Sequence, residues 1–235
     1  MMNQPFKIRI EELKNEFSTI FNELEKCTNK TVKLLAYFSL MECIAQDIAN
    51  YPTRENRKIF KDFVLKYQNV CTYLNELDPV TLFYRTEHII KKTIFVESFS
   101  MLSPDNEIIR EAAENVKNAL LQQTDPKTFK RYCEEHTYIN LLYTMRCRLS
   151  HEFSTSCIAI AQTIKTPHYI QSSFFDQGKL ESRWALQIPV DFVKAICENC
   201  ITNYLNECEE KEQIPLPNRM KTPYIKYSWF SYPIK

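Results

Sequence analysis

Two arginines and a histidine lie within six positions of each other near the end of a predicted helix. They are Arg146, Arg148 and His151, in the stretch "YTMRCRLSHEFS" of residues 143–154. An imidazole with a pKa of ~6.5 can exchange protons near neutral pH with a ribose hydroxyl or a leaving oxygen. A guanidinium stays charged and can hold a phosphate through two parallel hydrogen bonds. These residue types suit cleavage of RNA without a metal ion.

The positions within the stretch suggest a role for each residue. His151 is the candidate for proton transfer, and Arg146 is the candidate that stabilises charge on the phosphate. Arg148, Ser150 and Tyr143 are candidates for RNA contact, with the Tyr143 ring available to stack on a base. The alternative is structural, because the helix macrodipole favours cations in the last turn of any helix by about 0.3–1 kcal/mol.

Composition limits which other functions are open. The 235 residues carry a formal net charge of +1, so no overall charge attracts nucleic acid or an anionic membrane. The single glycine, Gly178, excludes the glycine-rich loops that bind nucleotide phosphates, and we expect no cofactor. The longest apolar run, residues 34–41, is far shorter than a membrane helix. The N-terminus lacks the layout of a signal peptide, and the nine cysteines lack a disulfide pattern, so we expect a cytoplasmic protein without a membrane segment.

Cys197 and Cys200 have a spacing that is also found in zinc sites. A tetrahedral zinc site needs two further ligands, and Cys208 lies too far along the same predicted helix to act with them. These cysteines instead form a stripe with Ile201 and Tyr204 at helical spacing. We therefore predict buried thiols on the core face of a helix, and no metal site.

Hydrophobic spacing predicts a mainly α protein. The first two helices carry apolar faces over residues 13–27 and 34–48. A third helix is predicted to start at Pro52, with Ile59, Phe63, Tyr67, Val70 and Leu74 on its inner face. Further helix starts are predicted where an N-cap residue precedes a proline, at Asp78, Ser103 and Asp125.

The sequence pattern changes after the arginine–histidine stretch, from helical spacing to short β-branched and aromatic stretches. The helix that starts at Asp125 is expected to break near His136 and to resume through His151. The stretches "CIAIAQTI", "HYIQSSFF" and "RWALQIP" then predict an antiparallel hairpin or a three-stranded sheet. Asp191 is the predicted N-cap of the last helix. The expected fold class is mainly α, a helical bundle with a small antiparallel β-hairpin or three-stranded insertion before the last helix.

The whole arrangement predicts one domain and a tail. The domain covers residues 1–213, with N-terminal helices over about 7–123 and the motif helix, hairpin and last helix over about 125–211. Residues 214–235 form a basic and aromatic tail without a helical pattern. A tail this apolar is expected to dock on the bundle or on a partner.

Arg146 and His151, with four residues between them at the end of an amphipathic helix, resemble the R-x4-6-H motif of HEPN domains. The resemblance covers roughly residues 125–210, including the hairpin and the helix after the motif. It implies a helical bundle, a metal-independent endoribonuclease that leaves 2′,3′-cyclic phosphate ends, and a toxin–antitoxin or phage-defence setting with a neutralising protein partner. Cys147 stands where many members carry a polar residue, often asparagine. That departure favours the alternative, a non-catalytic helical interaction or RNA-binding protein of the same fold.

Helix geometry sets a condition on any active site. At 100° per residue, His151 falls about 140° from Arg146 if the helix continues that far. Either the helix ends near Leu149 and His151 turns back, or a second copy of the chain supplies the missing group. The resemblance favours the second alternative, a homodimer with a composite site. We expect both side chains to be exposed in a cleft, whereas an intramolecular salt bridge that buries either one would argue against the site.

Overall fold

The computed structural model describes residues 5–49, 55–90, 99–152, 159–161, 164–176 and 179–216. Its elements confirm a mainly α fold with a small β insertion before the last helix. The helices are α1 (Pro5–Lys26), α2 (Lys30–Ile48), α3 (Asn56–Tyr67), the short 3₁₀ helix η1 (Tyr73–Asn75), α4 (Pro79–Thr86), α5 (Glu107–Leu121), α6 (Pro126–Glu135), α7 (Tyr138–Glu152) and α8 (Val190–Glu210); the strands are β1 (Ala159–Ala161), β2 (His168–Asp176) and β3 (Lys179–Pro189).

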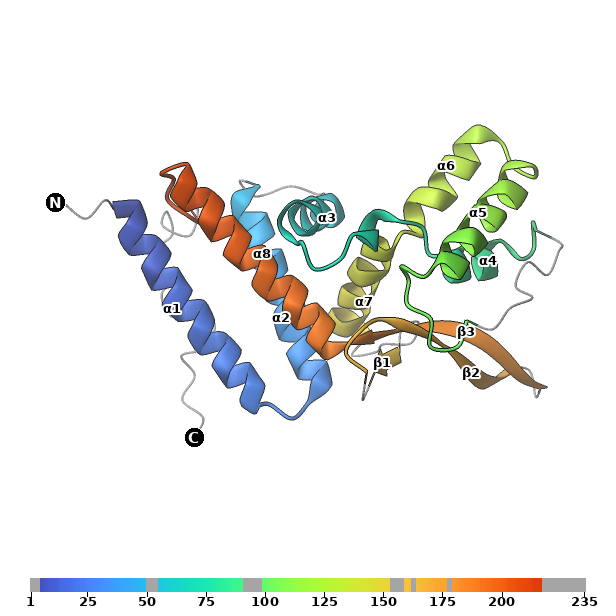
Figure 1. The fold of residues 1–235 in the computed structure, drawn as a ribbon, viewed down its shortest axis with the longest axis horizontal. Helices are drawn as coiled ribbons and strands as arrows, with labels where there is room; N and C mark the ends of the chain where they lie inside the picture. Colours follow the sequence, from blue (N-terminus) through green and yellow to red (C-terminus); the bar gives the residue numbers. More distant parts are fainter. Residues whose placement is uncertain are drawn as a thin grey trace.

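The main bundle contains α1, α2, α3, α7 and α8, with α8 running between α1 and α2 (Figure 1). Their apolar faces share one core, which also receives Tyr169, Leu186 and Ile188 from the sheet. Ion pairs join α1 to both ends of α8, from Lys14 to Glu209 at 3.5 Å and from Lys194 to Glu25 at 2.6 Å. The motif helix α7 is therefore one wall of a packed bundle.

Helices α4, α5 and α6 form a second group on the other side of α7 (Figure 1). Leu82, Ile90, Val116 and Leu120 make a smaller core there, separate from that of the main bundle. The N-cap predictions at Asp78 and Asp125 are confirmed in this group. Asp78 accepts a hydrogen bond from Thr81 N at 3.0 Å, and Asp125 accepts one from Lys127 N at 3.0 Å.

The predicted hairpin is confirmed as β2 and β3, which pair antiparallel from His168 opposite Gln187 to Asp176 opposite Lys179. The third strand, β1, runs parallel to β3, with Ala159 opposite Gln187, and completes the three-stranded form of the predicted insertion. The chain reverses direction between β1 and β2 and again between β2 and β3. Because of the two reversals, β1 points the same way as β3, and it pairs along the edge of β3 that β2 leaves open.

Two predicted helix starts are wrong by a few residues. Helix α5 begins at Glu107 rather than after Ser103, because the Asn106 side chain accepts the hydrogen bond from Ile108 N at 3.0 Å. Helix α8 begins at Val190 after Pro189, so Asp191 lies inside the first turn and makes no cap. An acidic side chain in that turn still interacts favourably with the helix dipole.

Helix α3 ends earlier than its hydrophobic pattern predicted. Gln68 is extended, and Asn69 N donates to Asn199 Oδ1 at 2.7 Å instead of continuing the helix. Val70 is consequently 38% exposed, while Leu74 is buried on η1. The predicted start at Pro52 lies outside the described residues. In the part of the chain that the structure describes, the helices are all too short or too polar to cross a membrane.

Candidate functional site

Helix α7 carries the whole arginine–histidine motif on continuous helix. The predicted inner face is confirmed, because Tyr138, Leu142, Met145 and Leu149 are all buried. The helix extends past His151 to Glu152, so the alternative in which it ends near Leu149 is wrong. Arg146 and His151 therefore diverge by about 140° around the helix axis.

Arg146 is engaged within its own chain. Its Nη2 donates to Glu42 Oε2 on α2, and its Nη1 lies 3.8 Å from the Cys147 sulfur. Only 18% of the Arg146 side chain and 10% of the Glu42 side chain are exposed. Burial opposes the charge on the guanidinium, but the Glu42 carboxylate and the Cys147 thiol outweigh it and raise the pKa of Arg146. The ion pair thus fastens α7 to α2.

The expectation that both motif side chains are exposed in a cleft is wrong for Arg146. The physical reason is a partner 104 residues away in the sequence, which no local pattern indicates. His151 is exposed in the last turn of α7. The two residues do not meet on one surface of the chain.

The neighbouring candidates also have local contacts. Ser150 Oγ donates to the Arg146 carbonyl at 3.0 Å, which is a bond within the helix. The half-buried Tyr143 ring packs 5.6 Å from the Phe60 ring, with the Arg57 guanidinium 5.6 Å from its centroid. Arg148 is half-buried and takes part in an interaction of its own. The motif surface is therefore occupied largely by contacts between α7 and the adjacent bundle.

The cysteine stripe on α8 is buried, as predicted. Cys197 and Cys200 are both fully buried, and their thiols point at the carbonyls of Tyr37 and Val64 at 3.5 and 3.9 Å. Burial raises the pKa of the Cys197 thiol well above its ordinary value, so it stays protonated. Within the described ranges, no group of histidines, cysteines and carboxylates is arranged to hold a metal ion.

A buried polar network that the sequence does not indicate lies beside the motif helix. The Asp78 carboxylate is fully buried and accepts from the Tyr169 hydroxyl, which in turn lies 2.7 Å from the Tyr138 hydroxyl. These residues join the start of α4, strand β2 and the start of α7. The sequence indicated only the N-cap role of Asp78, because the tyrosines lie 60 and 91 positions away from it and are brought together by the fold.

Comparisons of the chain with protein-family models, with curated proteins and with solved structures find no match. The resemblance to HEPN domains therefore rests on the motif and on the order of helices and hairpin. Its consequences for activity are proposals.

Proposed function

We propose that this chain is a non-catalytic helical interaction protein with a HEPN-like architecture, in which the arginine of the motif has a structural role. The observation that carries the proposal is the ion pair between Arg146 and Glu42. A guanidinium that holds two helices together in a half-buried contact has a function without any substrate.

The pair also opposes binding of a phosphate at Arg146. A phosphate that approached the guanidinium would come close to the Glu42 carboxylate, and like charges repel strongly where little water is present. Opening the pair would leave Glu42, which is 8% exposed as a residue, without its partner in the core. Both effects favour a protein partner over RNA, in line with the small net charge of the chain.

A cleavage assay tests this proposal. Purified protein is incubated with single-stranded RNA in EDTA, and the products are examined for 2′,3′-cyclic phosphate ends. We expect no cleavage above that of a matched His151→Ala preparation. Cleavage by the unaltered chain that disappears in the His151→Ala protein would overturn the proposal.

A second candidate is the metal-independent endoribonuclease that the motif resembles, with its defence or toxin–antitoxin setting and a neutralising partner. The exposure of His151 favours it, because an exposed imidazole at the end of α7 is accessible to a substrate or to a second chain. Since Arg146 and His151 diverge within one chain, this candidate requires a homodimer with a composite site. Sedimentation at micromolar concentration distinguishes the two, because a monomer that leaves RNA intact excludes the composite site.

A further inference from the structure

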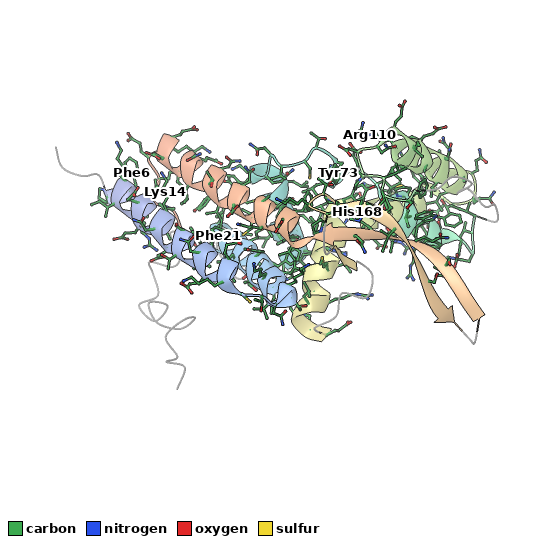
Figure 2. All side chains as sticks on the ribbon, turned by 60° about the horizontal axis from the view of Figure 1, so that its bottom comes forward. Phe6, Lys14, Phe21, Tyr73, Arg110 and His168 are labelled. Carbon is green, nitrogen blue, oxygen red and sulfur yellow. The ribbon has the colours of Figure 1, made fainter. Side chains whose placement is uncertain are left out.

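A groove lies at the start of α8, away from the arginine–histidine motif. It encloses about 490 Å³ and is lined by four segments: residues 70–73 before and within η1, residues 103–105 before α5, residues 165–167 before β2, and the first turns of α8. Figure 2 labels Tyr73 and His168 in the region where the bundle meets the sheet. We call this the α8 groove.

The floor of the α8 groove is aromatic. The Tyr73 and Phe192 rings are nearly parallel, at an interplanar angle of 3° and a centroid distance of 6.4 Å. Val70 extends this apolar surface and is 38% exposed. The two rings belong to the buried core, with Tyr73 6% and Phe192 7% exposed, and together with the exposed Val70 they give the groove an apolar floor. Such a floor favours ligands that carry apolar or aromatic side chains.

The rim of the groove is acidic on balance. Asp105 and Asp191 are both exposed, and within the described residues neither forms an ion pair. Asp105 and Cys71 both line the groove. Lys165 is the cation of the rim, and the positive end of the α8 dipole is offset by Asp191 in the first turn. Among the described residues that line the groove, two carboxylates against one ammonium favour a cationic ligand.

The last described residues, 213–216, fold back against the C-terminal part of α8. After the helix ends, Gln213 N donates to Cys208 O at 2.9 Å, and Leu216 N donates to the Tyr204 hydroxyl at 2.9 Å. Leu216 is fully buried, so the C-terminal tail is anchored at the level of Tyr204. The tail has therefore reversed direction and starts beside α8 rather than beyond its end.

A row of contacts connects that anchor to the groove. The Tyr204 ring packs edge-on to Tyr67 at 5.6 Å, and Asn69 N bonds to Asn199 one turn nearer the start of α8. The same backbone segment continues into Val70 and Tyr73, which line the groove. The segment after α3 thus follows α8 from the anchor to the groove.

The length of the tail matches this path. Twelve residues separate Phe192 from Tyr204 along α8, which at 1.5 Å per residue is about 18 Å. An extended chain spans that distance in about six residues. Residues 217–235, which lie outside the described ranges, are nineteen in number and contain Lys and Arg but no Asp or Glu. Their aromatic stretch, "YIKYSWF" of residues 224–230, begins eight positions after Leu216.

We propose that residues 224–230 of the same chain occupy the α8 groove, with their aromatic side chains on the Tyr73–Phe192 floor and Lys226 beside Asp105 and Asp191. The occupant is matched to the groove by charge, by aromatic content and by the length of its connection. The inference does not depend on how the motif on α7 acts.

Tryptophan fluorescence tests the proposal, because the chain has two tryptophans and one of them, Trp229, lies in the tail. In a Trp184→Phe background, Trp229 is the sole reporter. We expect blue-shifted emission that acrylamide quenches poorly and that does not change on dilution. The double charge reversal Asp105→Lys and Asp191→Lys should shift the emission to the red, whereas Glu11→Lys on the exposed face of α1 should not.

Limited trypsin digestion provides a readout that keeps Trp184, whose ring packs 5.7 Å from Phe99 and contributes to folding. Cleavage at Arg219, Lys221 and Lys226 reports the fraction of molecules in which the tail is released. We expect roughly tenfold faster cleavage in the Asp105→Lys and Asp191→Lys protein than in the Glu11→Lys control. Emission typical of a solvent-exposed Trp229 in the protein with the unaltered groove would overturn the proposal. So would a Trp229 that is buried at high protein concentration and becomes exposed on dilution, because the tail would then come from a second copy of the chain.

Discussion

Glu42 and Arg146 illustrate how a half-buried charge depends on its partner. Taking both charges out of water is costly, and their mutual attraction compensates for that cost only while both are present. When one partner is removed, the other charge remains desolvated without compensation. The consequence for stability can be measured separately from any activity.

Glu42→Gln is expected to lower the free energy of unfolding by about 1–3 kcal/mol, because Arg146 then keeps its charge without a carboxylate. Urea denaturation of both proteins measures the change. The matched control is Glu55→Gln, since Glu55 pairs with Lys58 at 3.7 Å and both side chains are more than 60% exposed. That control should change stability by less than about 1 kcal/mol. Equal losses in the two variants would show that the Arg146 pair is a solvated surface contact.

Asp78 leads to a prediction about pH. Burial raises the pKa of its carboxyl group, although hydrogen bonds from Thr81 and Tyr169 act in the opposite direction. A group whose pKa is raised in the folded state contributes stability that is fully present below its unfolded pKa of ~3.9. That contribution is lost as the pH rises through the folded pKa.

Asp78→Asn removes this titration, so the stability of the unaltered protein relative to the variant should fall as the pH rises from about 4 through the folded pKa of Asp78. Urea denaturation of both proteins across pH 4 to 8 measures the difference. The difference between the two proteins removes the contributions of other carboxyl groups to the pH dependence of stability. Glu207 is one of these groups, and Lys211 and Lys66 lower its pKa to about 2. Parallel stability curves would mean that Asp78 is accessible to water in solution.

Helix α5 shows at the scale of one element how two possible caps compete. Ser103 is followed by a proline and is a good N-cap by its sequence, but Asn106 starts the helix three residues later. Asn106 N donates to the Ser103 carbonyl at 3.0 Å, so Ser103 belongs to the turn before the helix. Asn106 therefore caps the helix, whereas Ser103 belongs only to the preceding turn.

Asn106→Ala is expected to destabilise the protein by about 1 kcal/mol, because the Ile108 amide loses its hydrogen-bond acceptor. Ser103→Ala should change stability by less than about 0.5 kcal/mol. Thermal or urea unfolding of the two variants under the same conditions gives the comparison. A larger loss of stability in Ser103→Ala than in Asn106→Ala would indicate that the helix starts at Ser103 in solution.

Two apolar clusters make up the core of the molecule. The larger cluster joins α1, α2, α3, α7 and α8 and also includes Val80 of α4 and Ile109 and Ala112 of α5, whereas the smaller cluster lies among α4, α5 and α6 around Leu120. The network of Asp78, Tyr169 and Tyr138 lies between the two groups of helices. The Tyr169 hydroxyl is its central member and forms hydrogen bonds with both Asp78 and Tyr138. The smaller group has less buried apolar surface and is therefore expected to open more readily.

Leu120→Ala is expected to cost about 2–4 kcal/mol, because the fully buried side chain leaves a cavity in the smaller core. Amide hydrogen exchange should accelerate in α4, α5 and α6 and stay almost unchanged in α8. Val193→Ala in α8, which is 1% exposed, is the matched change in the main core and should accelerate exchange there. Acceleration throughout the chain in both variants would show one cooperative unit.

Features that depend on interactions between neighbouring residues could be predicted from the amino-acid sequence. Helical spacing identified the helices of the bundle and the buried cysteine stripe of α8, and the pairs Asp78–Pro79 and Asp125–Pro126 marked two helix starts correctly. The break at His136 and the hairpin that follows the motif helix were also predicted. Such features follow from backbone hydrogen bonding and side-chain periodicity within a few residues.

The surroundings of those elements depend on contacts between residues far apart in the sequence, which the sequence does not indicate. Helix α3 ends at Tyr67 because Asn199, 130 positions later, takes the hydrogen bond of Asn69. The buried Asp78 has the hydroxyl of Tyr169, 91 positions later, as a hydrogen-bond donor, and Arg146 is ion-paired because α2 brings Glu42 against α7. The strength of a charge interaction depends on distance and on exclusion of water, and both are set by packing between elements far apart in the sequence.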